Sequence, residues 1–290
     1  MPRCSRRPTT AGDLMKYALN IPNFGSYARP HTLVELAQEA EEAGWDGFFL
    51  WDHIIVSREW CTPFVDPWVA LAAVAVKTET IRIGTLITPV ARRRPWILAR
   101  ETVSVDHLSN GRLILGVGLG NPPAEFEAFG EEGKNSVRAR KLDESLDILT
   151  GLWGGEEFSY SGEYYNMDEV TFLPKPVQSP RIPIWVACMW PHRKPLERAI
   201  QYEGVAPIHA DFPEDLALKD VKALVAWVHE YRQDAFDIVV SGATPDPENG
   251  CDIVAPFKDA GATWWSENIN GLRAPFNEMR TRIHKGPPEV

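Results

Sequence analysis

The pair of residues best suited to chemistry is Asp52-His53, which directly follows the apolar stretch 47–51. A histidine exchanges a proton near neutral pH, as an acid/base or redox site requires. If the stretch is a strand, successive side chains point to opposite faces, so only one of the two residues can face a ligand. His53 is therefore a candidate catalytic residue, although a histidine at such a position can also be structural.

A glycine-rich run, Gly116-Val-Gly-Leu-Gly120, invites comparison with dinucleotide-binding loops. That fingerprint needs a third glycine where Asn121 stands and a helix that opens at once, whereas Pro122-Pro123 follow here. A Rossmann site is therefore disfavoured. The glycines either let a flat ligand approach the end of a strand or allow tight packing there.

Two further groups could bind a ligand or be purely structural. The run Arg92–Arg94 stands before a predicted helix and could hold a phosphate or an acidic cofactor tail, or form a solvated face. The pair Trp264–Trp265 with Glu267 ends a predicted strand, and Trp51 and Trp60 flank a predicted loop. These aromatic side chains could stack on a ring system or belong to the core.

The sequence gives weaker support for a metal site or for a catalytic serine nucleophile. His53 and His209 with an acid could make a metal site, but the end of the first strand reads Asn20-Ile-Pro-Asn23 rather than the HxH pair of many barrel hydrolases. No GxSxG motif occurs. The four cysteines are scattered without CxxC spacing, which favours a cytoplasmic protein without disulfides or structural zinc.

Short β-branched runs alternate with amphipathic helices, a pattern typical of parallel β/α architecture. Thr32 with Glu35 suggests a capping box at the first helix, and Asp66-Pro67 suggests the start of the second. The eight expected strands are 17–21, 47–51, 81–87, 113–117, 182–187, 204–208, 236–240 and 262–265. Eight such units predict an α/β fold, a single (β/α)8 TIM barrel with insertions.

Active sites of this fold lie where the loops that follow the strands gather. The loops 52–65 and 118–134 are long, so we expect them to roof the pocket. The stretch 154–181, rich in Tyr, Gly and Pro, precedes a strand and should emerge at the opposite, N-terminal face.

Composition narrows the partners to a small-molecule substrate. The formal net charge of −10 disfavours nucleic acid and anionic membrane surfaces, and no apolar run approaches the length that crosses a bilayer. Residues 1–14 lack the apolar core of a secretory signal, and we expect them to be a disordered tail before a barrel domain at 15–290.

From residue 15 onward the chain resembles the luciferase-like flavin-dependent oxidoreductase superfamily, which includes FMN-dependent monooxygenases and enzymes dependent on the deazaflavin coenzyme F420. The resemblance rests on Glu42-Ala-Gly-Trp-Asp-Gly47, Trp51-Asp-His53, Ile83-Gly-Thr85, Thr88-Pro89, Arg94-Pro95, Asp106-His-Leu-Ser-Asn-Gly-Arg112, Leu115-Gly-Val-Gly-Leu-Gly120 and Ala124-Glu-Phe-Glu-Ala-Phe-Gly130.

The resemblance implies a barrel with a flavin or deazaflavin across its strand ends. It gives His53 the catalytic role beside the ring and Asp52 a place in the cofactor pocket. Leu86 to Thr88 match a bulge that backs the ring, where members often carry a non-prolyl cis peptide. Gly118 matches a pocket glycine.

Two departures qualify these expectations. The sugar-phosphate dehydrogenase branch has a glutamate where this chain has Asn121, so that activity is not expected. The usual Gly-Gly after strand five is Ala187-Cys188 here, which are the matching cofactor-binding positions but alter the path of the phosphate arm.

The absence of a large lid insertion and the block around Ala124-Glu-Phe126 favour coenzyme F420 over FMN. The alternatives are a non-catalytic flavin-binding barrel and a metal-dependent barrel hydrolase. The resemblance also implies a homodimer, while substrate specificity is expected to come from loops 54–65 and 121–134.

Overall fold

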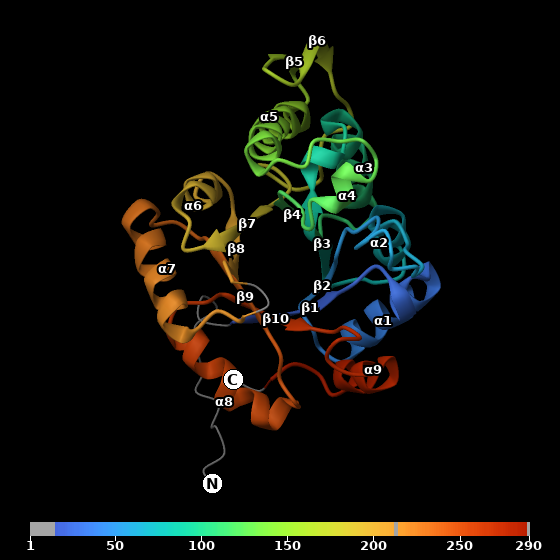
Figure 1. Ribbon diagram of the computed structural model, residues 1–290, viewed down its shortest axis with the longest axis vertical. Coiled ribbons are helices and arrows are strands. Elements are labelled where there is room, and N and C mark those ends of the chain that lie inside the picture. The colour runs from blue at the N-terminus through green and yellow to red at the C-terminus, as the bar shows by residue number, and fades with distance from the viewer. Residues whose placement is uncertain (1–14, 212–213, 289–290) are drawn as a thin grey trace.

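The computed structural model describes residues 15–211 and 214–288 and shows a closed barrel of eight parallel strands (Figure 1). The predicted (β/α)8 barrel is confirmed; the expected tail, 1–14, lies outside the described residues. Around the barrel the strands follow the order β1-β10-β9-β8-β7-β4-β3-β2. Their bounds are β1 Lys16–Ile21, β2 Gly47–Leu50, β3 Arg82–Pro89, β4 Leu113–Gly118, β7 Ile184–Trp190, β8 Gly204–His209, β9 Asp237–Gly242 and β10 Trp264–Asn268.

Helices surround the barrel in Figure 1. Asp66 caps α2 as predicted, by accepting a hydrogen bond from the Val69 amide. The capping box predicted for α1 is wrong, because the helix begins earlier, at Pro30, after Arg29. The helices are α1 Pro30–Glu42, α2 Pro67–Ala75, α3 Pro95–Leu108, α4 Ala124–Glu127, α5 Asn135–Gly154, α6 Arg193–Ala199, α7 Leu218–Tyr231, α8 Pro247–Asp259 and α9 Phe276–His284, with 3-10 turns η1 Gly25–Tyr27 and η2 Val90–Arg92. No helix in the described parts of the chain is both long and apolar enough to cross a membrane.

Two apolar layers hold the barrel. The larger one lies between strands and helices, whereas the smaller one fills the barrel and centres on Phe49, Trp185 and Trp264. Both indole nitrogens of that pair of tryptophans donate to Asp237, at 3.0 Å each. These rings plug the barrel, so a ligand must bind above them, at the C-terminal ends of the strands.

The stretch after α5 forms a two-stranded hairpin, β5 Glu157–Ser161 and β6 Asn166–Thr171, on the outside of α5 (Figure 1). Its return reaches the N-terminal face as predicted, where Asp106 accepts a hydrogen bond from the Val177 amide. The hairpin itself is fastened to the side of α5, because Glu144 of that helix accepts the amides of residues 163–165.

Candidate active site

The strand ends bring several predicted residues toward one another. Because side chains alternate along a strand, residues two positions beyond the barrel plug face the barrel axis. Leu86 packs on the plug itself, the same alternation places Gly118 and Ala187 above it, and His53 follows three residues after β2 ends at Leu50. These residues follow or belong to β2, β3, β4 and β7, which are neighbours in the barrel. These four members of the predicted set therefore lie on neighbouring strand ends.

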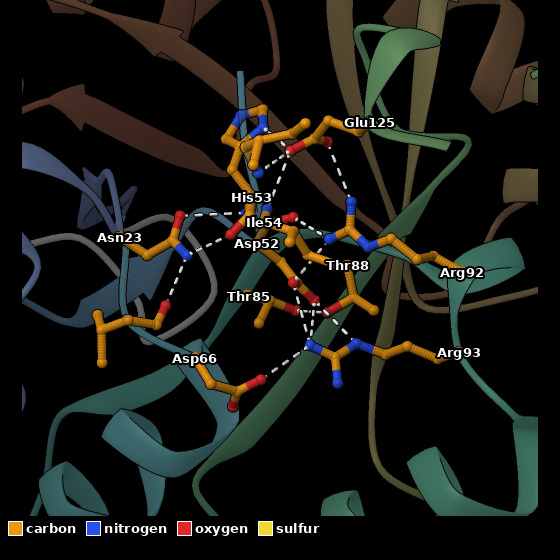
Figure 2. Close-up of polar contacts among 12 residues, drawn as sticks. Asn23, Asp52, His53, Ile54, Asp66, Thr85, Thr88, Arg92, Arg93 and Glu125 are labelled. Atoms are coloured by element: carbon orange, nitrogen blue, oxygen red, sulfur yellow. Dashed lines mark hydrogen bonds and ion pairs between the residues drawn. The ribbon is translucent and has the colours of Figure 1, made fainter. Parts of the chain in front are cut away.

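His53 is held by a carboxylate that the sequence did not single out. Its ring Nδ1 lies 3.1 Å from Oε1 of Glu125, which is completely buried in α4 (Figure 2). The same oxygen accepts the backbone amides of Ile54, at 3.0 Å, and Ile55, at 3.2 Å. The other oxygen accepts from Arg92 at 3.0 Å.

The Glu125 carboxylate can only accept hydrogen bonds, and it accepts them from the Ile54 and Ile55 amides and from Arg92. The contact with Nδ1 of His53 therefore requires that Nδ1 carry a proton and donate it. In the neutral ring the proton then sits on Nδ1, and Nε2 carries the free lone pair. The His53 side chain is 21% exposed. The geometry therefore presents a ring nitrogen that can accept or return a proton.

Asn23 fixes the backbone of His53. Its amide nitrogen donates to the His53 carbonyl at 2.8 Å and to the Val65 carbonyl at 2.7 Å, while its oxygen accepts the His53 amide at 3.1 Å. Asn23 is completely buried. It ties the end of β1 to both ends of loop 52–65, and no sequence signal set it apart from Asn20.

The Asp52 carboxylate points away from the mouth and is almost fully buried. It accepts from Arg92 at 3.0 Å and from Arg93 at 3.0 and 3.1 Å (Figure 2). Burial opposes charge on Arg93, but the Asp52 carboxylate outweighs it and raises the Arg93 pKa. Arg92 and Arg93 form neither a phosphate site nor a solvated face, because both make ion pairs with buried acids inside the protein. Arg94 lies over the Trp96 ring.

The bulge predicted in β3 is confirmed, since its register with β4 shifts between Thr85 and Thr88. The Leu86-Ile87 peptide bond is cis. Thr88 is completely buried, and its hydroxyl donates to that of Thr85 at 3.0 Å. The Thr88 side chain thus supports the bulge from behind and does not line the mouth.

Tight packing accounts for the glycines of β4. A Cβ at Gly116 would lie 2.1 Å from the Thr85 carbonyl oxygen, and one at Gly118 would lie 2.9 Å from Cδ1 of Ile87. Gly120 has a φ of +81°, which favours glycine. The same packing leaves the floor of the mouth without a protruding side chain at Gly118.

Ala187 and Cys188 of β7 separate into two environments. Ala187 faces the barrel axis, whereas Cys188 is buried in the layer between strands and helices. Burial raises the pKa of its thiol to about 12. The structure therefore does not bring the Cys188 side chain to the mouth.

The four tryptophans proposed to stack on a ligand fall into two groups, one inside the protein and one near His53. Trp264 belongs to the barrel plug and Trp265 to the outer core, where its indole donates to Glu267, so neither reaches the mouth. Trp51 and Trp60, in contrast, both contact the ring of Phe24, which also contacts His53.

The two histidines proposed for a metal lie beside different acids, Glu125 for His53 and Asp211 for His209. His209 accepts the Asp211 amide through Nδ1 at 3.1 Å. Within residues 15–211 and 214–288, no three His, Cys, Asp or Glu side chains are grouped to hold an ion.

A parallel barrel with a carboxylate-held histidine at its strand ends is the architecture of a TIM-barrel enzyme site. The chain belongs to the luciferase-like monooxygenase family, which it matches over residues 11–237. An F420-dependent glucose-6-phosphate dehydrogenase of Microbacterium testaceum is 32% identical over 60% of this chain and 51% of its own length. An F420-dependent hydroxymycolic acid dehydrogenase of Mycobacterium tuberculosis is 31% identical over 65% and 52%.

Solved structures share the fold at low identity. A monooxygenase from Streptomyces bottropensis is 20% identical with a TM-score of 0.74, covering 93% of this chain and 97% of its own. An F420-dependent secondary alcohol dehydrogenase, in complex with an F420-acetone adduct, is 18% identical with a TM-score of 0.74, covering 88% and 93%. This chain spans about half the length of the curated relatives it matches.

Proposed function

We propose that this protein is a flavin- or deazaflavin-dependent oxidoreductase in which His53 exchanges a proton with an oxygen atom of a small organic substrate. The observation that carries the proposal is the hydrogen bond from Nδ1 of His53 to buried Glu125, which leaves Nε2 as the proton acceptor beside the barrel mouth. Family membership and the relatives named as F420-dependent dehydrogenases support it.

The residues of the mouth fit a flat, largely apolar ring. Leu86, Gly118 and Ala187 offer aliphatic or bare surface next to His53, and the plug beneath them excludes a deeper position. The hydroxyl of Ser266, just above the plug on β10, is completely buried and has no hydrogen-bond partner in this structure. When bound, the cofactor would supply the hydride or oxygen chemistry.

The protein's own part is then orientation, exclusion of water and one proton transfer. Glu125 fixes the tautomer of His53, and Asn23 fixes its backbone. In an oxidation, Nε2 accepts the proton of a substrate hydroxyl; in a reduction, the protonated ring returns it to a carbonyl oxygen. Asp52 contributes by holding Arg92, which in turn holds Glu125.

Coenzyme F420 is the favoured cofactor and FMN the second. Titration of the purified protein with each, followed by absorption and fluorescence, tests the choice. We expect quenching or a spectral shift with F420; a response to FMN alone would reverse the assignment. Binding without turnover in either direction would favour the non-catalytic flavin-binding barrel.

His53→Ala tests the catalytic assignment. Cofactor binding should stay near normal while turnover falls on the order of 10²-fold or more, the usual contribution of a positioned acid/base group. Unchanged turnover would remove His53 from this role. Self-association as a homodimer is part of the same proposal, and light scattering of the eluted protein measures it.

A further inference from the structure

An aromatic cluster surrounds His53 on the side of β1 and β2. We define it as Phe24, Trp51, Trp60 and Phe64. The Phe24 ring is its hub, with centroids 5.7 Å from Trp51, 5.3 Å from Trp60 and 5.3 Å from Phe64. His53 lies 5.8 Å from both Phe24 and Trp51, edge to face. A molecule that reaches Nε2 therefore meets aromatic rings.

The cluster is open rather than a closed core. Trp60 is 45% exposed, and Phe24, Trp51 and Phe64 are partly exposed. Two more large apolar side chains, Met189 of β7 and Ile208 of β8, are 40% and 39% exposed at the strand ends. Exposed apolar side chains that gather on one surface indicate that a ligand covers them, and the aromatic cluster beside His53 is such a surface.

Charge is nearly absent from the positions that face the barrel axis above the plug. Among them His53 is the one ionisable residue, and the two asparagines bond to each other at 3.2 Å. These positions are Asn20, Trp51, His53, Leu86, Gly116, Gly118, Ala187, Met189, Ile208, Ser241, Ser266 and Asn268. The nearby arginines Arg92 and Arg93 are neutralised by buried acids. A phosphorylated substrate would find no ionic partner among these axis-facing residues.

We infer that the substrate is an uncharged molecule with an aromatic or bulky apolar body and a hydroxyl or carbonyl group at its reacting carbon. This inference rests on the proposed function. The apolar body packs on the cluster, above all on Trp60, and the oxygen reaches Nε2 of His53. In the oxidising direction, the O–H bond gives its proton to His53, and the C–H bond gives a hydride, with two electrons, to the oxidised cofactor. A secondary alcohol thereby becomes a ketone, and the reverse steps reduce the ketone.

Binding of acetophenone to the full chain, by isothermal calorimetry and saturation-transfer NMR without cofactor, tests the cluster directly. Trp60→Ala should weaken binding about tenfold, the loss expected when one aromatic contact is removed. Trp60→Phe should retain most of the affinity. Tyr231→Ala is the matched control, because Tyr231 is a 60% exposed aromatic residue on α7 outside the cluster, and it should change nothing.

Equal affinity of wild type and Trp60→Ala, with an unchanged far-UV circular dichroism spectrum, would overturn the inference. A turnover arm separates it from the proposed function. With F420 or FMN present, 1-phenylethanol should be oxidised in preference to glucose 6-phosphate. Faster turnover of the sugar phosphate would refute the substrate class and leave the oxidoreductase standing. If neither cofactor binds, the proposed function fails, while the acetophenone measurement still decides the character of the pocket.

Discussion

Glu125→Gln isolates the contact on which the site depends. The substitution keeps the volume of the side chain but replaces one carboxylate oxygen by an NH2 group. The amide oxygen can still accept the backbone amides of Ile54 and Ile55. Its nitrogen then faces Arg92, a donor against a donor, and the charge that held the arginine is lost.

The magnitude follows from the burial of these partners. Removing one partner of a buried ion pair costs about 3–5 kcal/mol, and a hydrogen bond to a charged group is worth about 1.5–3 kcal/mol. Arg92 keeps its second acid, Asp52, at 3.0 Å, so the cost should lie near the lower figures. We expect a loss of about 2–3 kcal/mol, which lowers the melting temperature by roughly 5–10 °C in a domain of this size.

The histidine reports the functional effect. In the Glu125→Gln variant the oxygen that faces His53 remains an acceptor but is no longer charged, so it holds the proton on Nδ1 less strongly, and ¹⁵N NMR of the His53 ring should show a partial shift toward the Nε2-protonated tautomer. Turnover should fall on the order of 10- to 100-fold, as when the partner that orients a functional histidine is lost. Glu127→Gln is the control, because Glu127 lies on the same helix and is exposed. If Glu125→Gln matched the control in melting temperature, tautomer and turnover, the positioning role of Glu125 would be refuted.

Three further results are expected. Gly116→Ala should destabilise the fold by about 1–3 kcal/mol in denaturant titration, because its Cβ would lie 2.1 Å from the Thr85 carbonyl oxygen, a backbone atom of the neighbouring strand; wild-type stability would contradict the packing. Alkylation by iodoacetamide with peptide mapping should label exposed Cys61 and spare Cys188, whose pKa burial raises to about 12, until the protein is unfolded. Burial acts to raise the pKa of Glu41, but backbone hydrogen bonds from the turn before β3 outweigh it and hold the pKa below its usual value. The ionised Glu41 carboxylate therefore stabilises the fold fully at neutral pH, and this stabilisation is lost as pH falls through the lowered pKa. The difference in unfolding free energy between wild type and Glu41→Gln should accordingly shrink in acid. A difference that does not change with pH would contradict this assignment.

Periodicity carried the fold prediction because it reports directly on burial. All eight expected strands were found within a few residues of their bounds, and Asp66 capped α2 as its type and position indicate. The predicted cap of α1 failed because Pro30, whose fixed φ suits a first helical turn, starts the helix two residues before Thr32.

The site was only partly predictable. His53 was found from its position after an apolar strand, but its partner Glu125 lies 72 residues further along the chain. The available sequence signal was the short run Ala124-Glu-Phe-Glu127, in which the aromatic Phe126 is the residue expected to face the core. The structure buries Phe126 and, beside it, Glu125. Four residues are too few for a periodic pattern to show which glutamate points inward.

The arginine run shows why charge alone misleads. A solvated face, a phosphate site and an internal ion pair all begin with the same residue type. What distinguishes them is the position of acids far away in sequence, here Asp52 and Glu125, each bonded to Arg92.

These buried charges are better explained by orientation than by stability. A set of apolar residues can often replace a buried ion-pair network without loss of stability. Such a set could not join the end of β2, the segment after β3 and helix α4 through directed hydrogen bonds to Ile54, Arg92 and His53. The buried carboxylates of Asp52 and Glu125 balance the guanidinium groups of Arg92 and Arg93, and the less buried Asp66 and Glu101 each lie 3.5 Å from Arg93 as well. Within the proposed function, this network leaves Nε2 of His53 as the ring atom that exchanges the proton, because Nδ1 is bonded to Glu125.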